Sequence, residues 1–146
     1  ALMGDDHTAE SSTTAHQSEF TFIDVMMPVL SPAGVQEILD YGLYGWAMSR
    51  FTGTWVGLKC LKDTIDSTAS IEADVERINP VYPTDFPMPP GGVSVRPRDG
   101  ILPQEERLQE DKRDAMLAFL RANPINQIIT SGGAKPRIGV ITSGKS

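Results

Sequence analysis

The chain has 146 residues, of which 40% are hydrophobic, a single cysteine and a formal net charge of −6 at pH 7. This length and apolar content fit one globular domain, and a negative net charge without a basic run argues against a nucleic-acid partner. One cysteine excludes an internal disulfide and a cysteine-ligated iron–sulfur cluster, so we expect a reducing, cytoplasmic setting. No apolar run approaches the roughly 18 residues of a spanning helix, so we expect no membrane partner.

The first 30 residues predict a strand, a polar loop and a second strand. Residues 1–3 have the apolar character of a strand end, and residues 4–19 are rich in Ser, Thr, His and acidic side chains, as in a functional surface loop. Residues 20–30 predict a strand that Pro28 must interrupt or place at a sheet edge.

The clearest helix comes next. Ser31 is suited to cap it, Pro32 to its first turn and Gly53 to its end. Apolar residues recur at three- and four-residue spacing and predict one buried face, made of Val35, Ile38, Leu39, Gly42, Leu43, Trp46 and Ala47.

Residues 55–61 predict another strand, and residues 64–73 a less regular extended run. Strand, helix and strand in this order indicate a parallel crossover. The predicted fold class is therefore α/β, with a partial parallel sheet and flanking helices.

The second half of the chain begins with a long connector. Residues 79–103 contain seven prolines and three glycines, which predicts an irregular segment. A helix over 104–122 should follow, ending at Asn123-Pro124, with one apolar face made of Leu108, Ala115, Met116, Phe119 and Leu120. Residues 138–142 form a β-branched run that predicts a strand. Since both chain ends resemble interrupted strand units, we expect a piece of a longer protein; the alternative is a small domain with frayed ends.

Residues 139–146 match the letters of the Walker A phosphate-binding motif. A working loop of this kind needs a flexible stretch of N–H donors after a strand and a helix after the Lys-Ser. Gly139 instead lies inside the apolar run, and the chain ends where the helix should begin. We therefore interpret the match as an ordinary turn. Gly91-Gly92 is interpreted as a tight turn as well, with close approach to a ligand as the alternative.

Two groups in the polar loop place metal-type ligands close together in sequence. One is His7 with Asp5, Asp6 and Glu10, and the other is His16 with Glu19. No HExxH-like helical spacing occurs, so we expect a solvated polar loop and no metal site. A serine nucleophile, Ser11 or Ser12 activated by His16, is less favoured because no nucleophile-elbow motif is present.

The same loop carries a family resemblance. Gly4-Asp5-Asp6-His7, Ser11-Ser12 and His16-Gln17-Ser18-Glu19 resemble the signature loop of the 2-oxoacid:ferredoxin oxidoreductases in its aryl-pyruvate (indolepyruvate) variant. Further stretches that resemble this thiamine diphosphate-dependent family are residues 28–30, 35–43, 45–50, 55–60, 85–86, 88–92 and 139–146.

The resemblance implies a division of the chain. Residues 1–78 would be the later half of the pyrimidine-binding domain, 79–135 a Pro-rich connector plus helix, and 136–146 the first strand and turn of a transketolase C-terminal-like domain. The implied activity is oxidative decarboxylation of aryl pyruvates such as indolepyruvate to acyl-CoA.

The resemblance also implies cofactors and partners. The whole enzyme would use thiamine diphosphate, magnesium and iron–sulfur clusters, with coenzyme A and ferredoxin as partners and a homo-oligomeric assembly. We expect this chain alone to bind none of the cofactors and to be inactive, because the activating glutamate, the magnesium–diphosphate motif and the cluster cysteines lie elsewhere in the family.

The expected site residues follow from the loop. The resemblance places Ser11, Ser12, His16, Gln17 and Glu19 near the active site. His16 is the candidate catalytic residue, since an imidazole is suited to hydrogen-bond the substrate carboxylate or a developing alkoxide. A structural role in loop closure is the alternative for His16, and a scaffold, subunit-contact module or free-standing small-ligand binding domain is the alternative for the chain.

Overall fold

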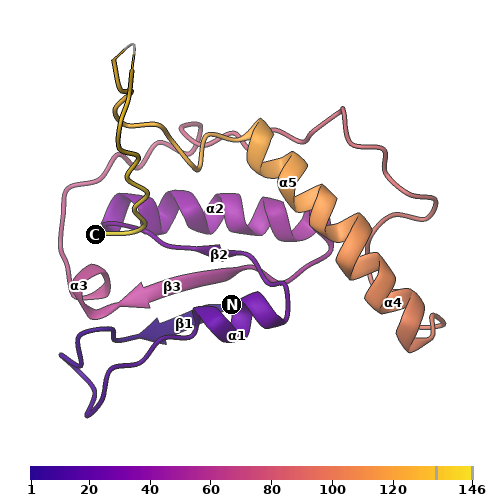
Figure 1. Ribbon diagram of the computed structural model, residues 1–146, viewed down its shortest axis with the longest axis horizontal. Helices are drawn as coiled ribbons and strands as arrows, with labels where there is room; N and C mark the ends of the chain where they lie inside the picture. The colour runs from indigo at the N-terminus through magenta and orange to yellow at the C-terminus, as the bar shows by residue number, and fades with distance from the viewer. Residues whose placement is uncertain (134, 146) are drawn as a thin grey trace.

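The computed structural model describes residues 1–133 and 135–145 and confirms the α/β class. Its sheet has three parallel strands: β1 (Leu2–Asp5), β2 (Val29–Leu30) and β3 (Gly57–Leu61), in the order β1-β3-β2. Met3 pairs with Lys59, and Val29 pairs with Gly57. All three strands therefore end at the same edge of the sheet, where the loop after β1 and helix α3 (Lys62–Ile65) lie (Figure 1).

Helices cover both faces of this sheet. Leu58 on β3 packs into the core beneath α2 (Val35–Thr52). The next side chain along the strand, Lys59, contacts Glu19 at the start of α1 (Glu19–Asp24). Because successive side chains of a strand point to opposite faces, α1 and α2 lie on opposite sides of β3.

The hydrophobic core lies between the sheet, α2 and α5 (Arg113–Ala122), which crosses the carboxyl end of α2 (Figure 1). Its buried members come from both halves of the chain: Leu30, Ala47, Met48, Val56, Phe119 and Ile125. The predicted face of the second helix is confirmed at Ala115, Met116 and Phe119. None of the helices in the described part of the chain is both long and apolar enough to cross a membrane.

The predicted strand over residues 20–30 is wrong for most of its length. Residues 19–24 form α1, because the Ser18 carbonyl accepts the N–H groups of Thr21 and Phe22 at 3.1 and 3.3 Å. Met26, with a positive φ of 52°, then turns the chain into the two-residue strand β2. Phe20 is largely exposed, so the two-residue spacing of Phe20 and Phe22 does not mark the buried face of a strand.

The predicted buried face of the first helix is confirmed at Ala47 and wrong at Leu39, Leu43 and Trp46. Leu39, Leu43 and Trp46 are 46%, 52% and 71% exposed, whereas Gly45, Ala47, Met48 and Thr52 are buried. A Cβ at Gly45 would lie 3.1 Å from the Leu30 side chain, so the small residues allow α2 to approach the sheet closely. The helix begins at Val35 and not at Ser31, since the Glu37 carboxylate accepts the Ala33 N–H ahead of it at 2.7 Å.

Three other expectations change. The extended run predicted over 64–73 is replaced by the short α3 followed by irregular chain. The second helical segment begins at Ile101 as α4 (Ile101–Arg107) and continues through a π-helical turn, η1 (Leu108–Lys112), into α5. Residues 138–142 form no strand, and Ile138, Val140 and Ile141 are at least 84% exposed, because no described strand lies beside them for backbone pairing.

The structure also tests what the sequence predicts for the connector and for the two glycine motifs. The irregular connector is confirmed, and Gly91 and Gly92 both have positive φ in a turn closed by the Gly92 N–H on the Pro89 carbonyl at 2.8 Å. In the Walker A match, the described residues 139–145 contain no helix, Gly144 and Lys145 lie in a turn, and Ser146 lies outside the described residues.

Gly53 ends α2 in the left-handed conformation, with φ of 66°, and a Cβ there would lie 2.7 Å from the Val93 carbonyl oxygen. Gly53→Ala is therefore expected to lower the free energy of unfolding by about 1–2 kcal/mol or more, because of backbone strain and the clash. Urea denaturation measures the change. The matched variant Gly42→Ala, in the exposed middle of α2 with open space around it, should instead stabilise by about 0.5–1 kcal/mol. Equal effects of the two variants would contradict this account.

Candidate functional site

The polar loop after β1 is held around the carboxylate of Asp6. This side chain accepts the backbone N–H groups of Glu10, Ser11 and Ser12 at 2.9, 2.8 and 2.6 Å. It also accepts the hydroxyls of Ser11 and Ser12 at 3.2 and 2.8 Å. The N–H of Glu10 first, with those of Ser11 and Ser12, holds the pKa of Asp6 well below its ordinary value. Asp6 is thus an ionised centre that fixes the loop.

The two ends of the loop meet beside the sheet. The N–H of Asp6 donates to the His16 carbonyl at 3.1 Å, and the N–H of His16 donates to the Asp6 carbonyl at 2.8 Å. These two bonds form an antiparallel bridge at the neck of the loop. The segment between them is therefore a closed surface loop whose shape is set by the chain itself.

The last residue of β1, Asp5, orients His16. Its fully buried carboxylate accepts the Ser18 hydroxyl at 2.6 Å and lies 3.1 Å from His16 Nδ1. Burial alone would raise the pKa of Asp5, but hydrogen bonds from Ser18 and His16, together with the charge of Lys59, bring the pKa below its ordinary value. An ionised carboxylate only accepts, so His16 carries its proton on Nδ1 and leaves Nε2 for another partner.

Three of the five predicted site residues line one hollow. Ser11, Ser12 and His16 border an open depression of about 630 Å³ at the carboxyl ends of β1 and β3, with Cys60, Lys62, Ile65 and Asp66 on the opposite side. Ligands of open parallel sheets bind at this edge. Gln17 is exposed outside the lining of the depression, and Glu19 lies at the start of α1 against Lys59. The structure therefore brings together Ser11, Ser12 and His16, and separates Gln17 and Glu19 from them.

The serine–histidine pair weighed from the sequence does not form among the described residues. Both serine hydroxyls donate to Asp6, and that of Ser12 also donates to the Thr14 carbonyl at 2.6 Å. His16 bonds Asp5 instead. Ser11 and Ser12 are thus positioned as loop-fixing groups, and His16 borders the depression with its imidazole held by Asp5.

A different set of residues offers metal-type ligand atoms. Asp5, His7 and Glu19 have one such atom each, all within 4.8 Å of one another, a combination that the sequence spacing did not suggest. The ammonium of Lys59 contacts Glu19 and lies 3.9 Å from Asp5 Oδ2. Because this ammonium takes the position of a cation between the two carboxylates, we interpret the set as an ion-pair network.

Sequence reasoning missed the residues that build the site. Asp5 and Asp6 were considered as metal ligands and as part of the signature loop, but not as the groups that hold the loop, and Lys59 was considered only as part of the predicted strand over residues 55–61. The available signal was an Asp-Asp pair directly after a strand with Ser-Ser five residues further on, a spacing at which an aspartate can bond the N–H groups of the following loop. A lysine inside the apolar run 55–61 was a second signal, because a buried lysine requires an acidic partner.

Comparisons with known proteins found no family model, no curated protein and no solved structure that matches the chain. The fold and the site together define an α/β domain with a preformed polar loop beside the carboxyl edge of a parallel sheet.

Asp6→Asn is expected to loosen the loop, since an amide oxygen replaces a carboxylate that accepts five hydrogen bonds. The folded-state pKa of Asp6 is lowered, so its contribution to stability is present above the ordinary value of 3.8 and is lost as the pH falls below it. Hydrogen exchange at the Ser11 and Ser12 amides should become faster. The free energy of unfolding should also fall less steeply as the pH is lowered from about 5 to about 2. The exposed Asp85→Asn is the control. Unchanged protection of both serine amides would argue against the role of Asp6.

Proposed function

We propose that the chain is part of a thiamine diphosphate-dependent oxidoreductase that oxidatively decarboxylates aryl pyruvates, such as indolepyruvate, to acyl-CoA and passes the electrons to ferredoxin. The observation that carries the proposal is the position of Ser11, Ser12 and His16 on one hollow at the carboxyl edge of a parallel sheet. These are residues of the loop that resembles the family's signature. The hollow is where a substrate of such a fold would lie.

The residues of this chain do not provide the ligands that the cofactors of this proposal require. The sequence contains one cysteine and no Gly-Asp-Gly motif, so cluster ligation and magnesium–diphosphate binding require other parts of the enzyme. In the proposal residues 1–78, 79–135 and 136–146 belong to three parts of the larger protein, which is cytoplasmic and homo-oligomeric. Thiamine diphosphate would supply the carbon chemistry there, and this chain would contribute one wall of the substrate site.

His16 has the clearest role in the proposal. Its Nδ1–H is held by Asp5, so the orientation of the ring is fixed and Nε2 is the atom that meets a substrate. In its imidazolium form, with Nδ1–H held on Asp5, His16 would donate from Nε2 to the carboxylate of an aryl pyruvate. The loop fixed by Asp6 would keep the imidazole in place without a large change of shape.

The test uses the protein encoded by the complete reading frame, loaded with its cofactors. We expect indolepyruvate-dependent reduction of ferredoxin that requires coenzyme A. His16→Gln should lower kcat/KM by about a hundredfold, because the hydrogen bond from Nε2 to the substrate is lost. Thr13→Ala, in the same exposed loop, is the control with unchanged kinetics. Absence of turnover with every aryl pyruvate would refute the proposal, whereas turnover unaffected by His16→Gln would refute only the role of His16.

A second candidate, a subunit-contact module, is favoured by one observation. The segment from the connector into α4 exposes apolar side chains that are between 46% and 86% accessible: Val81, Tyr82, Met88, Val95, Ile101 and Leu102. Such residues are suited to a protein interface. Sedimentation of the chain over a range of concentrations tests this candidate. Association that is lost in Met88→Ser/Leu102→Ser, but kept in the exposed Leu117→Ser on α5, would support it, and a monomer at all concentrations would exclude self-contact through this segment.

A further inference from the structure

The α4–α5 segment contains two buried cations that the proposed function does not use. Arg107 and Lys112 are each only 9% exposed. Arg107 forms an ion pair with Asp99, whereas Lys112 pairs with no carboxylate among the described residues and donates to the Gly53 carbonyl at 2.8 Å. A buried ammonium normally has an acidic partner, so the charge of Lys112 is only partly compensated.

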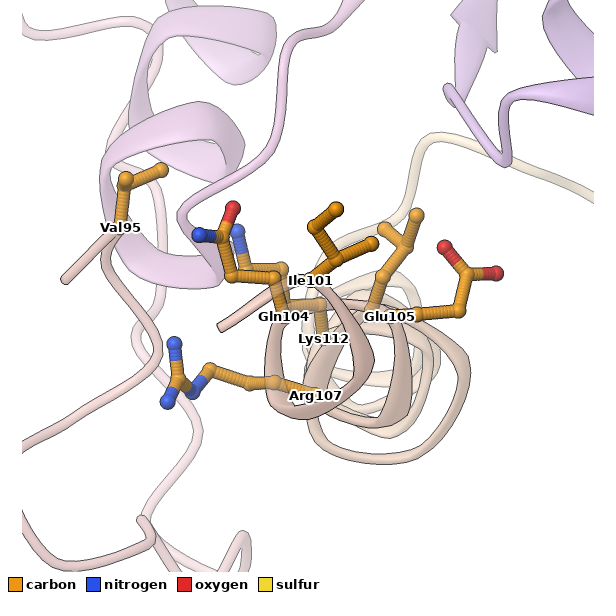
Figure 2. Close-up of a pocket in the computed structure, with 7 residues that line it drawn as sticks. Val95, Ile101, Gln104, Glu105, Arg107 and Lys112 are labelled. Atoms are coloured by element: carbon orange, nitrogen blue, oxygen red, sulfur yellow. The ribbon is translucent and has the colours of Figure 1, made fainter. Parts of the chain in front are cut away.

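The π-helical turn explains why these two cations lie together. Residues five apart in an α-helix point about 140° away from each other, since each residue turns the chain by about 100°. The wider turn over 108–112 brings positions 107 and 112 toward the same side. Figure 2 shows the side chains of Arg107 and Lys112 reaching the side of the helix where Val95 lies, and the carboxylate of Glu105 pointing away from them. Single π-turns of this kind are frequent at functional sites.

A cavity of about 290 Å³ lies beside this pair of cations. Its lining includes the apolar side chains of Val95, Ile101 and Leu108, the amide of Gln104, and Glu105, whose carboxylate points away from the two cations (Figure 2). Small-molecule pockets usually occupy about 300–1,000 Å³, so a cavity at the lower limit accepts only a small ligand.

From this geometry we propose a binding site for a small oxyanion, a phosphate group or a carboxylate, between Lys112 and Arg107 at the π-turn. An oxyanion presents two or more acceptor oxygens, which suits a guanidinium beside an ammonium. Burial, and then the charge of Arg107, lower the pKa of Lys112, and a bound anion would compensate both effects. The only carboxylate that is ion-paired to either cation among the described residues is Asp99, which competes with the ligand for Arg107.

The experiment is a titration of the ¹⁵N-labelled chain followed by NMR at constant ionic strength. One arm uses sodium phosphate, one uses sodium isobutyrate, and sodium chloride is the reference. We expect saturable shifts of the amide signals of residues 104–112 with at least one of the two oxyanions, and the better ligand identifies its class. Chloride-like, non-saturable changes with both oxyanions would overturn the proposal.

Variants distinguish the site from general charge attraction. Lys112→Met should weaken binding by about tenfold or more, as expected for loss of a charged hydrogen-bond donor. Arg113→Gln removes a neighbouring, half-exposed cation on α5 and should leave binding unchanged. Equal affinities of the native chain and Lys112→Met would overturn the proposal. If Lys112→Met fails to fold by circular dichroism, Asp99→Asn decides: it frees Arg107, so tighter binding supports the site and unchanged or weaker binding refutes it.

Discussion

Replacing Phe119 with alanine is expected to lower the free energy of unfolding by about 3–5 kcal/mol. The Phe119 side chain is fully buried, and its ring lies 6.1 Å from that of Phe51 and 6.5 Å from that of Tyr82. The substitution removes a large apolar surface and leaves a cavity between α5, α2 and the connector. Because small domains have a total stability of about 5–15 kcal/mol, this loss is a large fraction of the total, and the variant should unfold at a much lower urea concentration. Urea denaturation followed by circular dichroism measures the loss.

Leu117→Ala is the matched control for this prediction. Leu117 lies on the same helix but is about half exposed, and alanine favours helix formation at least as well as leucine. The control should change stability by less than about 1 kcal/mol. If both variants lost the same stability, the placement of α5 against α2 and the connector would be incorrect.

Lys59→Met is expected to cost about 3 kcal/mol, the lower part of the range for breaking a buried ion pair. The Lys59 side chain is 6% exposed and lies between the fully buried carboxylate of Asp5 and that of Glu19. Methionine fills a similar volume but leaves the charge of Asp5 without its cation. Glu19 is one-third exposed and can be rehydrated, which limits the cost. Thermal unfolding followed by near-ultraviolet circular dichroism measures the change.

Two variants check the reason for this cost. Lys62→Met, which breaks only the exposed pair with Glu10, should have little effect. Adding Asp5→Asn to Lys59→Met should recover part of the lost stability, because the uncompensated buried charge is then removed. A double variant that is less stable than Lys59→Met by the full cost of Asp5→Asn alone would contradict the ion-pair account.

The elements that the sequence predicts well are those with strong local signals. The periodicity of residues 35–52 and the glycine at position 53 predict α2 and its left-handed end. The prolines of residues 79–103 predict an irregular connector, because proline removes a backbone donor and fixes φ. Tertiary contacts were not needed for either prediction.

The errors arise where tertiary contacts decide between local alternatives. Helix α2 carries apolar residues on more than one side, and periodicity alone placed Leu43 and Trp46 in the buried face with Ala47 and missed Met48, which packs inward. The choice depends on Gly45, whose missing side chain allows close approach to the sheet. In the same way, the run after Ser18 forms a helix because Glu19 at its start meets Lys59 on a strand 40 residues away.

The candidate site was predicted in part. The sequence predicted a functional surface loop that contains Ser11, Ser12 and His16, and the structure places these three residues on one hollow. Gln17 and Glu19 lie outside the lining of this hollow, since neighbours in an irregular loop need not face the same side. The roles of Asp5 and Asp6 required the loop's hydrogen bonds, which depend on its closed shape.

Because of the bridge between Asp6 and His16, the loop can be replaced without changing the sheet. Its two backbone hydrogen bonds join the ends of the loop at one point beside the sheet, so the length of residues 7–15 has no effect on the strand register. The entropic cost of closing a loop rises only slowly with length, by about 0.6 kcal/mol for each doubling. Engineered versions with longer or shorter loops should therefore change the outline of the hollow while the same three strands are kept.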